Sequence, residues 1–197
     1  MVETKVGVDS RAAIINAARE FFGTRGYAST SLVDVARAAH VTKGAVYHHF
    51  GSKQGLFKAV HDAVRVEVQA HYGGGLDLNV APVELIQQVV AAYLDIVLDP
   101  IVQRITLIDA PAVLGPDFLG GRAQDSFYLE FRDFLQAGMD AGRIRRTDAG
   151  ALTRILRGAS IQAAFFIAQS DDQGVARAEL GGALRVIIDG LAVHSTM

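Results

Sequence analysis

Apolar residues recur at helical spacing along almost the whole chain. The run from Val83 to Leu98 is a clear example, with a proline at residue 82 in the position of a helix start. Glycine and proline interrupt the pattern at intervals, and no stretch alternates with the period of two that marks a strand. The pattern predicts an all-α protein of about nine helices.

Two short helices with a tight turn are predicted between residues 31 and 50, SLVDVARAAHVTKGAVYHHF. Ser31 followed three residues later by Asp34 is a capping box, which marks a helix start. The apolar stripe breaks at His40, and Thr42 can cap a second helix. Only about two residues separate the helices, so they must cross sharply, as in a helix-turn-helix.

The second helix of this pair carries a polar, basic face. Gly44 costs about 1 kcal/mol relative to alanine inside a helix, which is reasonable where a backbone or base edge must come close. Hydroxyl, ammonium, phenol and imidazole groups suit phosphates and base edges in a major groove. A plain surface hairpin is the alternative, but length, turn, caps and polar face together favour a DNA reader. The polar face is formed by Thr42, Lys43, Gly44, Tyr47 and His48.

Charge is distributed unevenly along the chain. Residues 1–60 hold eight lysines and arginines against four acidic residues, a net charge of +4, and the total of −2 leaves −6 for the remainder. A basic N-terminal part followed by an acidic remainder is typical of a DNA-binding domain joined to a domain that does not bind DNA.

Composition narrows the class of protein further. The chain has 197 residues, 50% of them hydrophobic, and no cysteine, which excludes disulfides and thiolate metal sites. The N-terminus lacks a signal-peptide pattern, and the most apolar run, residues 159–168, is too short to span a bilayer. We expect a cytoplasmic protein.

The N-terminal 60 residues resemble the TetR family of bacterial transcription regulators, with many matching positions at fixed spacing. Two positions depart from the family pattern. His40 stands where the family usually has glycine, although histidine tolerates a left-handed backbone. Gly55 stands where the family often has an acidic residue or alanine. We expect this glycine to loosen the link between the helix-turn-helix and the rest of the chain. The matching runs are Ile14 to Ala18, Phe22, Arg25 to Tyr27, Thr30 to Leu32, Val35-Ala36, Val41 to Gly44, Val46 to Phe50, Ser52-Lys53 and Leu56-Phe57.

The resemblance implies a DNA-binding domain over residues 1–51 and a helical regulatory and dimerisation domain over residues 52–197. It implies that the helix after Ser52 links the two. Bases or phosphates would be contacted by Thr42, Lys43, Gly44 and Tyr47, and the DNA backbone positioned by Ser31, His48 and Lys53.

The last two predicted helices are more apolar than one face of a small helical body requires. A single recognition helix reads little DNA, so a two-fold dimer is expected, and the family dimerises through its last two helices. Packing within one chain is the alternative explanation of the same pattern. The candidate interface residues are Ile155, Gly158, Ala159, Gln162, Leu184, Ile187, Ile188 and Leu191.

A ligand pocket in the body is implied by the resemblance, although aromatic residues at helical spacing are more often core. Asp109 lies in a predicted break with two prolines, residues 109–116. It can cap a helix, pair with Arg104 or face a ligand, and the first two roles are preferred. The candidate ligand residues are Tyr93, Asp109, Phe127, Phe131, Phe165 and Phe166.

Catalysis finds little support. Neighbouring histidines at 48 and 49 point about 100° apart on a helix and cannot chelate one metal. No phosphate loop or nucleophile elbow is present, so no enzyme activity, metal or cofactor is predicted. The leading hypothesis is a homodimeric repressor released from an inverted repeat by a small apolar or aromatic ligand. The alternatives are a ligand-independent regulator or activator, and a small-molecule-binding protein whose helix-turn-helix no longer binds DNA.

Several helix boundaries can also be predicted. Residues 1–9 lack periodicity and are expected to form a mobile arm before a helix capped by Asp9 or Ser10. That helix should end at Gly26, whose freedom at positive φ suits a helix terminus, and Tyr27 should then close the three-helix core. Long helices are expected from about Phe118 to Ala141 and from Val175 to about His194.

Overall fold

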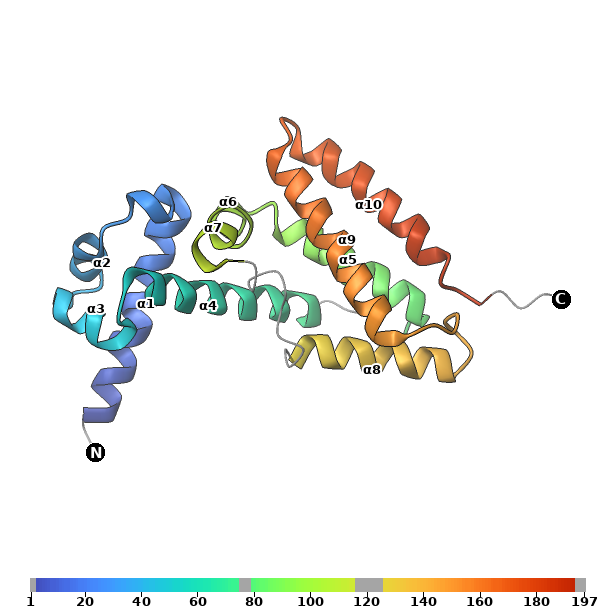
Figure 1. The fold of residues 1–197 in the computed structure, drawn as a ribbon, viewed down its shortest axis with the longest axis horizontal. Helices are drawn as coiled ribbons and strands as arrows, with labels where there is room; N and C mark the ends of the chain where they lie inside the picture. The colour runs from blue at the N-terminus through green and yellow to red at the C-terminus, as the bar shows by residue number, and fades with distance from the viewer. Residues whose placement is uncertain (1–2, 75–78, 116–125, 194–197) are drawn as a thin grey trace. The chain divides into compact units, whose positions relative to one another are not determined.

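The computed structural model describes residues 3–74, 79–115 and 126–193 (Figure 1). Across these residues no strand forms, and one isolated bridge pairs Ile144 with Ala192. The all-α prediction is confirmed. The elements are α1 (Glu3–Ser29), α2 (Leu32–Ala38), α3 (Lys43–Phe50), α4 (Lys53–Gly74), α5 (Pro82–Ile96), α6 (Pro100–Gln103), the π-helical turn η1 (Arg104–Asp109), α7 (Ala110–Leu114), α8 (Ser126–Asp140), α9 (Ala149–Gln169) and α10 (Gln173–Asp189).

The chain divides into two compact units. Unit 1 comprises Met1–Glu67 and Asp99–Gly120, and unit 2 comprises Val68–Leu98 and Gly121–Met197. The helix α4 runs without interruption from one unit into the other. The functional boundary after residue 51 stays a prediction.

The core of unit 1 is aromatic. The Phe22 ring lies edge-on to Phe57 at 5.1 Å, and Tyr27 contacts both rings, with centroids 5.8 Å from Phe22 and 5.2 Å from Phe57. Such pairs add to the stabilisation that burial alone gives. Tyr27 therefore closes the three-helix core, as the sequence predicted.

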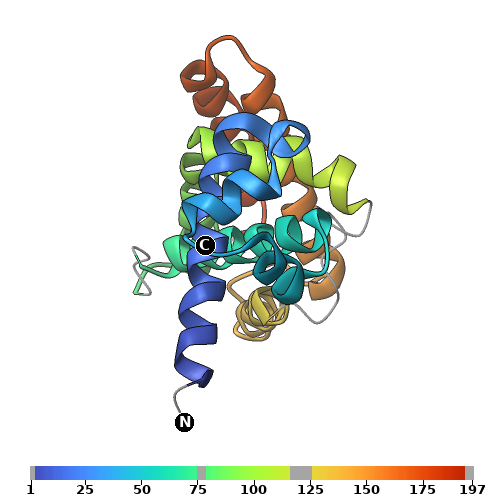
Figure 2. The ribbon, with the colours of Figure 1, turned by 90° about the vertical axis from the view of Figure 1, so that its left-hand side faces the viewer.

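The first helix is longer than predicted. It begins at Glu3, so the prediction of an arm over residues 1–9 was wrong for residues 3–9 (Figure 2). An established helix adds further residues at little cost, because only nucleation is unfavourable. The predicted end at Gly26 is confirmed, since this residue has φ 80° and breaks the helical backbone before Tyr27.

The 99–115 segment, which comprises Asp99, α6, η1, α7 and Gly115, folds within unit 1. A Cβ on Gly23 of α1 would lie 2.5 Å from the side chain of Ile101, so the absence of a side chain at Gly23 makes room for this residue. The break predicted at residues 109–116 was wrong as far as Leu114. Proline lacks only an N–H that the first helical turn does not use, and Pro111 lies in the first turn of α7.

Unit 2 has an aliphatic core formed by α5, α8, α9 and α10. Polar contacts join α10 to α5: Arg177 donates to Asp95 at 2.7 Å, and Gln87 donates to Asp189. Fully or nearly fully buried residues are Ile86, Leu94, Leu135, Met139, Ile144, Ile167 and Ile188.

The helix boundaries in unit 2 agree partly with the sequence pattern. Asp148 caps α9 by accepting from the Ala151 amide at 2.6 Å, as predicted. The last helix ends at Asp189, so its predicted extension toward residue 194 was wrong. The predicted start of α8 near residue 118 lies outside the described residues.

Among the described helices, none is by itself long and apolar enough to cross a membrane. The helix α5 reaches those limits only when it is counted together with Pro100–Leu114.

Candidate DNA-binding surface

The start of α2 is fixed by its cap. The Ser31 hydroxyl accepts a hydrogen bond from the Val33 amide at 3.2 Å, which satisfies one of the free N–H groups of the first turn. Asp34 forms an ion pair with Arg37 at 3.3 Å. The helix therefore starts where the capping pattern placed it, with Ser31 exposed at its N-terminus.

The turn between α2 and α3 depends on an unusual backbone conformation. His40 has φ 55°, a left-handed value that non-glycine residues adopt at a cost of about 1–2 kcal/mol. The Val41 amide then donates to the Ala36 carbonyl at 2.9 Å and closes the turn. The expectation that histidine preserves this turn is confirmed.

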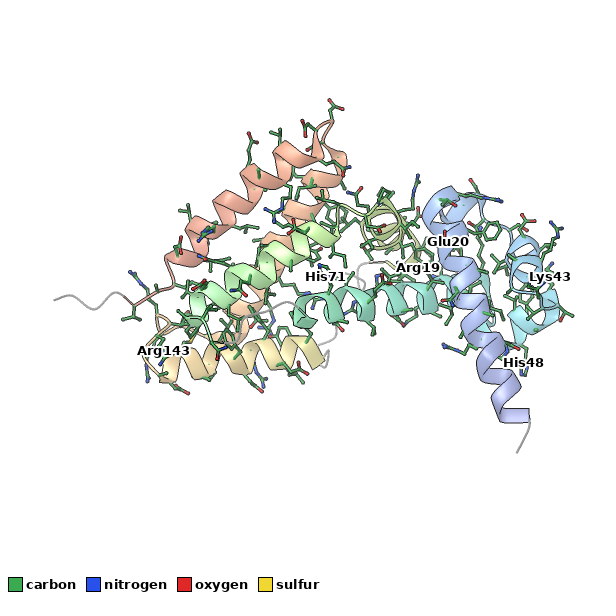
Figure 3. The ribbon with its side chains drawn as sticks, turned by 180° about the vertical axis from the view of Figure 1, so that it is seen from behind. Arg19, Glu20, Lys43, His48, His71 and Arg143 are labelled. Atoms are coloured by element: carbon green, nitrogen blue, oxygen red, sulfur yellow. The ribbon has the colours of Figure 1, made fainter. Side chains whose placement is uncertain are left out.

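The recognition helix α3 presents polar groups on one side and packs on the other. Thr42 caps it, accepting from the Ala45 amide at 3.1 Å, and Val46 is buried beneath it. Its outer side carries exposed Lys43, Gly44, Tyr47 and His48, of which Figure 3 labels Lys43 and His48. The predicted polar face is therefore solvent-accessible, on a helix whose start is capped.

Several basic side chains of unit 1 already have partners. Arg19 pairs with Glu67 at 3.0 Å and Lys58 with Asp62 at 2.6 Å. Among the described residues, no carboxylate lies within ion-pair distance of Lys43, whose Nζ lies 5.6 Å from the Tyr47 ring centroid. The positive charge on the recognition helix is therefore concentrated at Lys43 and remains available to a phosphate or base.

One basic residue that the sequence did not single out supports α3. The Arg11 guanidinium lies 5.4 Å from the ring centroid of Phe50, at the C-terminal end of the recognition helix. A cation near a helix C-terminus interacts favourably with its dipole. In the sequence, Arg11 could only be assigned to the first helix. That position alone does not indicate that its guanidinium contacts Phe50.

The histidine buried in α4 adds no positive charge near neutral pH. Burial, reinforced by the charge of Arg65, lowers the pKa of His61 to about 4, although Asp62 acts in the opposite direction. His61 is therefore neutral in the folded protein under ordinary conditions.

Lys53 is engaged within unit 1. Its Nζ donates to the Ala28 carbonyl at 3.1 Å and lies 4.6 Å from the Tyr27 ring centroid. This side chain joins the start of α4 to the end of α1. Its predicted contact with the DNA backbone stays a prediction and requires the side chain to exchange one acceptor for another.

Gly55 tightens the turn before α4. Its amide donates to the Ser52 hydroxyl at 2.9 Å, and the backbone carbonyl oxygen of Phe50 occupies the place where a Cβ would be. The glycine therefore permits a close approach of the Phe50 carbonyl, and its predicted effect on the link to the rest of the chain stays a prediction.

Alanine substitutions at Gly55 and Gly44 should have opposite effects on stability. Gly55→Ala should lower the free energy of unfolding by about 2 kcal/mol, because the new Cβ forces the Phe50 carbonyl to move. Gly44→Ala is the matched control. Its Cβ meets only the Thr42 hydroxyl at 3.7 Å, and helix propensity should raise stability by about 0.5–1 kcal/mol. Chemical denaturation measures both, and equal effects of the two substitutions would contradict this account.

The candidate ligand residues are divided between the units. Tyr93, Phe131 and Phe134 pack against the core of unit 2, and burial raises the pKa of Tyr93 to about 12, against a smaller effect of Arg157. Phe127 stacks on Phe131 at 6.0 Å. Phe165, on α9, is half-buried. The ligand contacts of these residues stay a prediction.

Two other ligand candidates have different surroundings. Asp109 belongs to unit 1, where its Oδ2 accepts from the Tyr27 amide at 2.7 Å. It makes no side-chain cap hydrogen bond to α7, the helix that follows it. Phe166 is 59% exposed on the outer side of α9. Contact of Asp109 and Phe166 with a ligand stays a prediction.

The predicted interface residues separate into an exposed and a buried group. Ile155 is 66% exposed and Ile187 is 58% exposed, and Gly158 and Gln162 are also exposed. Leu184 and Ile188 are instead buried in the core of unit 2. Ala159 and Leu191 are half-buried.

The exposed apolar residues of α9 and α10 define what we call the outer stripe. A Cβ on Gly158 would meet nothing within 4 Å, so this part of α9 is open to close approach by another surface. Two exposed valines of α10, Val175 and Val186, were not among the predicted interface residues. The outer stripe comprises Ile155, Phe166, Val175, Val186 and Ile187.

Metal binding finds no support in the described part of the chain, where no group of three or more histidine, aspartate and glutamate residues could hold an ion.

Two family models match the chain. The model described as "Bacterial regulatory proteins, tetR family" matches residues 14–60, which include α2, α3 and the start of α4. The model described as "Tetracyclin repressor-like, C-terminal domain" matches residues 83–191, more than half of the chain.

Similar proteins include regulators of known name and a solved structure. The HTH-type transcriptional regulator TtgR of Pseudomonas putida is 46% identical over 56 residues, which are 28% of this chain and 27% of TtgR. The Transposon Tn10 TetC protein of Escherichia coli is 24% identical over 74% of each chain. A TetR-family transcriptional regulator from Pectobacterium atrosepticum has a TM-score of 0.77 and 32% identity, covering 96% of this chain and 97% of its own.

Proposed function

We propose that this chain, which belongs to the TetR family of bacterial transcriptional regulators, is a homodimeric repressor that a small ligand releases from DNA. Members of the family are DNA-binding regulators and not enzymes, and they typically act as dimers that respond to small molecules. The repressor role, the operator form, the ligand and the contact residues are the parts that we propose.

The observation that carries the proposal is the outer face of α3. Lys43 and Tyr47 are exposed next to Gly44, which leaves open space for a base edge or a phosphate. Ammonium and phenol groups on a recognition helix donate to base acceptors in the major groove and to phosphates. We assign base or phosphate contacts to Thr42, Lys43, Gly44 and Tyr47, with Ser31, His48 and Lys53 positioning the DNA backbone.

The outer stripe supports the dimer. Large exposed apolar side chains on the last two helices are candidates for an interaction site, and Ile155, Phe166 and Ile187 are each more than half exposed. Two copies joined with two-fold symmetry would present two recognition helices to two half-sites about one helical turn of DNA apart. The operator should therefore be an inverted repeat, bound in the cytoplasm where the chromosome is accessible.

Release by a ligand requires a difference in affinity between two arrangements of the dimer. A small apolar or aromatic ligand within unit 2 must prefer the arrangement that does not fit the operator. A coupling free energy of about 2–3 kcal/mol between the two sites would weaken DNA binding roughly 30- to 150-fold.

Selection of genomic fragments by the purified protein at about 150 mM salt tests the proposal, because phosphate contacts make affinity depend steeply on salt. We expect sequencing to show one sharply enriched inverted repeat. Enrichment of single half-sites would contradict the dimer, and absence of any enrichment would contradict operator binding. Titration of candidate small molecules against the recovered protein–DNA complex then measures whether any of them releases the DNA. Release identifies a ligand-responsive repressor, and its absence identifies a regulator that does not respond to ligands.

A further inference from the structure

We propose that Asp109 is a positioning residue for the DNA reader, holding the junction of α1 and α2 through a hydrogen bond to the Tyr27 backbone. The bond would let the 99–115 segment set the placement of the recognition helix. This regulatory role rests on the proposed function, because it needs a reader that binds an operator.

The bond lies at a break in the backbone. Oδ2 of Asp109 accepts from the Tyr27 amide at 2.7 Å, across 82 positions of sequence, in a partly buried environment. Gly26, with φ 80°, turns the chain just before this amide. A partly buried amide at a helix break needs an acceptor, and a charged acceptor gives a stronger bond than a neutral one.

The junction leads directly into the reader. The Thr30 hydroxyl donates to the Gly26 carbonyl at 2.8 Å, and the next residue, Ser31, caps α2. The Tyr27 ring also packs in the core against Phe57 of α4. A displacement of the Tyr27 backbone would therefore shift the start of α2 and disturb the packing of α4.

The 99–115 segment is fixed to unit 1 at further points. The Ile101 side chain fills the space left by the missing side chain at Gly23. Gln54 of α4 donates from Nε2 to the Val113 carbonyl at 2.7 Å. Beyond the segment the chain belongs to unit 2 on both sides, through Leu98 and after Gly120. The segment is thus packed within unit 1, whereas the chain before Asp99 and after Gly120 belongs to unit 2.

The π-helical turn makes the Asp109 contact sensitive to register. Residue 109 is the last of η1, which lies between α6 and α7. Single π-helical turns within α-helices are rare and frequently mark functional sites. A change of one residue between π and α register would rotate the Asp109 side chain by about 100° and remove it from the Tyr27 amide.

Three substitutions test the role in the full chain. Asp109→Ala removes the acceptor, Asp109→Asn retains an amide oxygen at the same place, and Asp99→Ala is the matched control within the same segment. Asp99 accepts from the Ile101 amide at 2.7 Å and caps α6, so its loss should weaken the segment without removing the hydrogen bond to the Tyr27 amide.

The first readout is amide hydrogen exchange of the protein without DNA. Asp109→Ala should speed exchange at Tyr27 about tenfold, in line with the loss of one hydrogen bond, whereas Asp109→Asn stays closer to wild type. Asp99→Ala should leave exchange at Tyr27 unchanged. Unchanged exchange in Asp109→Ala, or equal acceleration in Asp99→Ala, would overturn the proposal.

The second readout is affinity for the inverted-repeat fragment recovered in the selection. Asp109→Ala should weaken binding about tenfold at fixed salt, with Asp109→Asn recovering most of the loss and Asp99→Ala close to wild type. Wild-type affinity in Asp109→Ala would overturn the positioning role. If the wild-type protein recovers no fragment, the proposed function fails, and the role in DNA binding fails with it. The exchange data would still show whether the Asp109 bond forms.

Discussion

Ile187→Glu should convert the protein to a monomer and weaken operator binding at least about 100-fold, because a glutamate buried without a partner costs several kcal/mol. Ile187 is 58% exposed on the outer stripe, so the substitution leaves the core of unit 2 intact. In a two-fold dimer each substitution is present in both copies, which doubles the cost. Analytical ultracentrifugation gives the mass, and fluorescence anisotropy gives the affinity.

Val66→Glu is the matched control for this experiment. Val66 is an exposed apolar residue of α4, 64% accessible and outside the outer stripe, and it receives the same change in charge and a similar change in size. It should leave both mass and DNA affinity near wild type. A dimer that persists with Ile187→Glu would show that the outer stripe is not the interface.

Combining Lys43→Ala with Tyr47→Phe should lower operator affinity about 100-fold and reduce the salt dependence of binding by about two phosphate contacts per dimer. Lys43 lacks a carboxylate partner within ion-pair distance in the described structure, and Tyr47 is 46% exposed beside it. Their removal should therefore affect DNA binding without unfolding the reader. Titrations at several salt concentrations measure both the affinity and the slope.

Arg132→Ala provides the control for lost positive charge. Arg132 pairs with Asp133 at 2.6 Å on α8, in unit 2, so its removal should change neither affinity nor slope. If the variant with substitutions at Lys43 and Tyr47 bound the operator with an unchanged salt slope, the assignment of α3 as the reading helix would be wrong.

Local features of the reader were predictable because they depend on neighbouring residues. The caps at Ser31 and Thr42, the left-handed turn at His40 and the helix break at Gly26 all follow from side chains within a few positions. The polar face of α3 was visible in the sequence because a core helix does not place lysine, tyrosine and histidine on one side.

Tertiary contacts were not predictable in the same way. Asp109 contacts Tyr27 across 82 positions, and no local pattern indicates that the 99–115 segment packs with the reader. Lys53 looked like a free phosphate contact, yet it donates to the Ala28 carbonyl. Helical spacing also could not separate the outer stripe from the core, because Ile187 and Ile188 are adjacent and face different environments.

The uninterrupted helix α4 has a mechanical consequence. Its 22 residues form a rod of about 33 Å, so tilting one end by about 5° moves the other by about 3 Å. That displacement is comparable to a hydrogen-bond length of about 3 Å between a side chain and a base edge. In the proposed dimer, a rotation of α4 smaller than the spread of ordinary helix packing angles would be enough to take both recognition helices out of register with their half-sites.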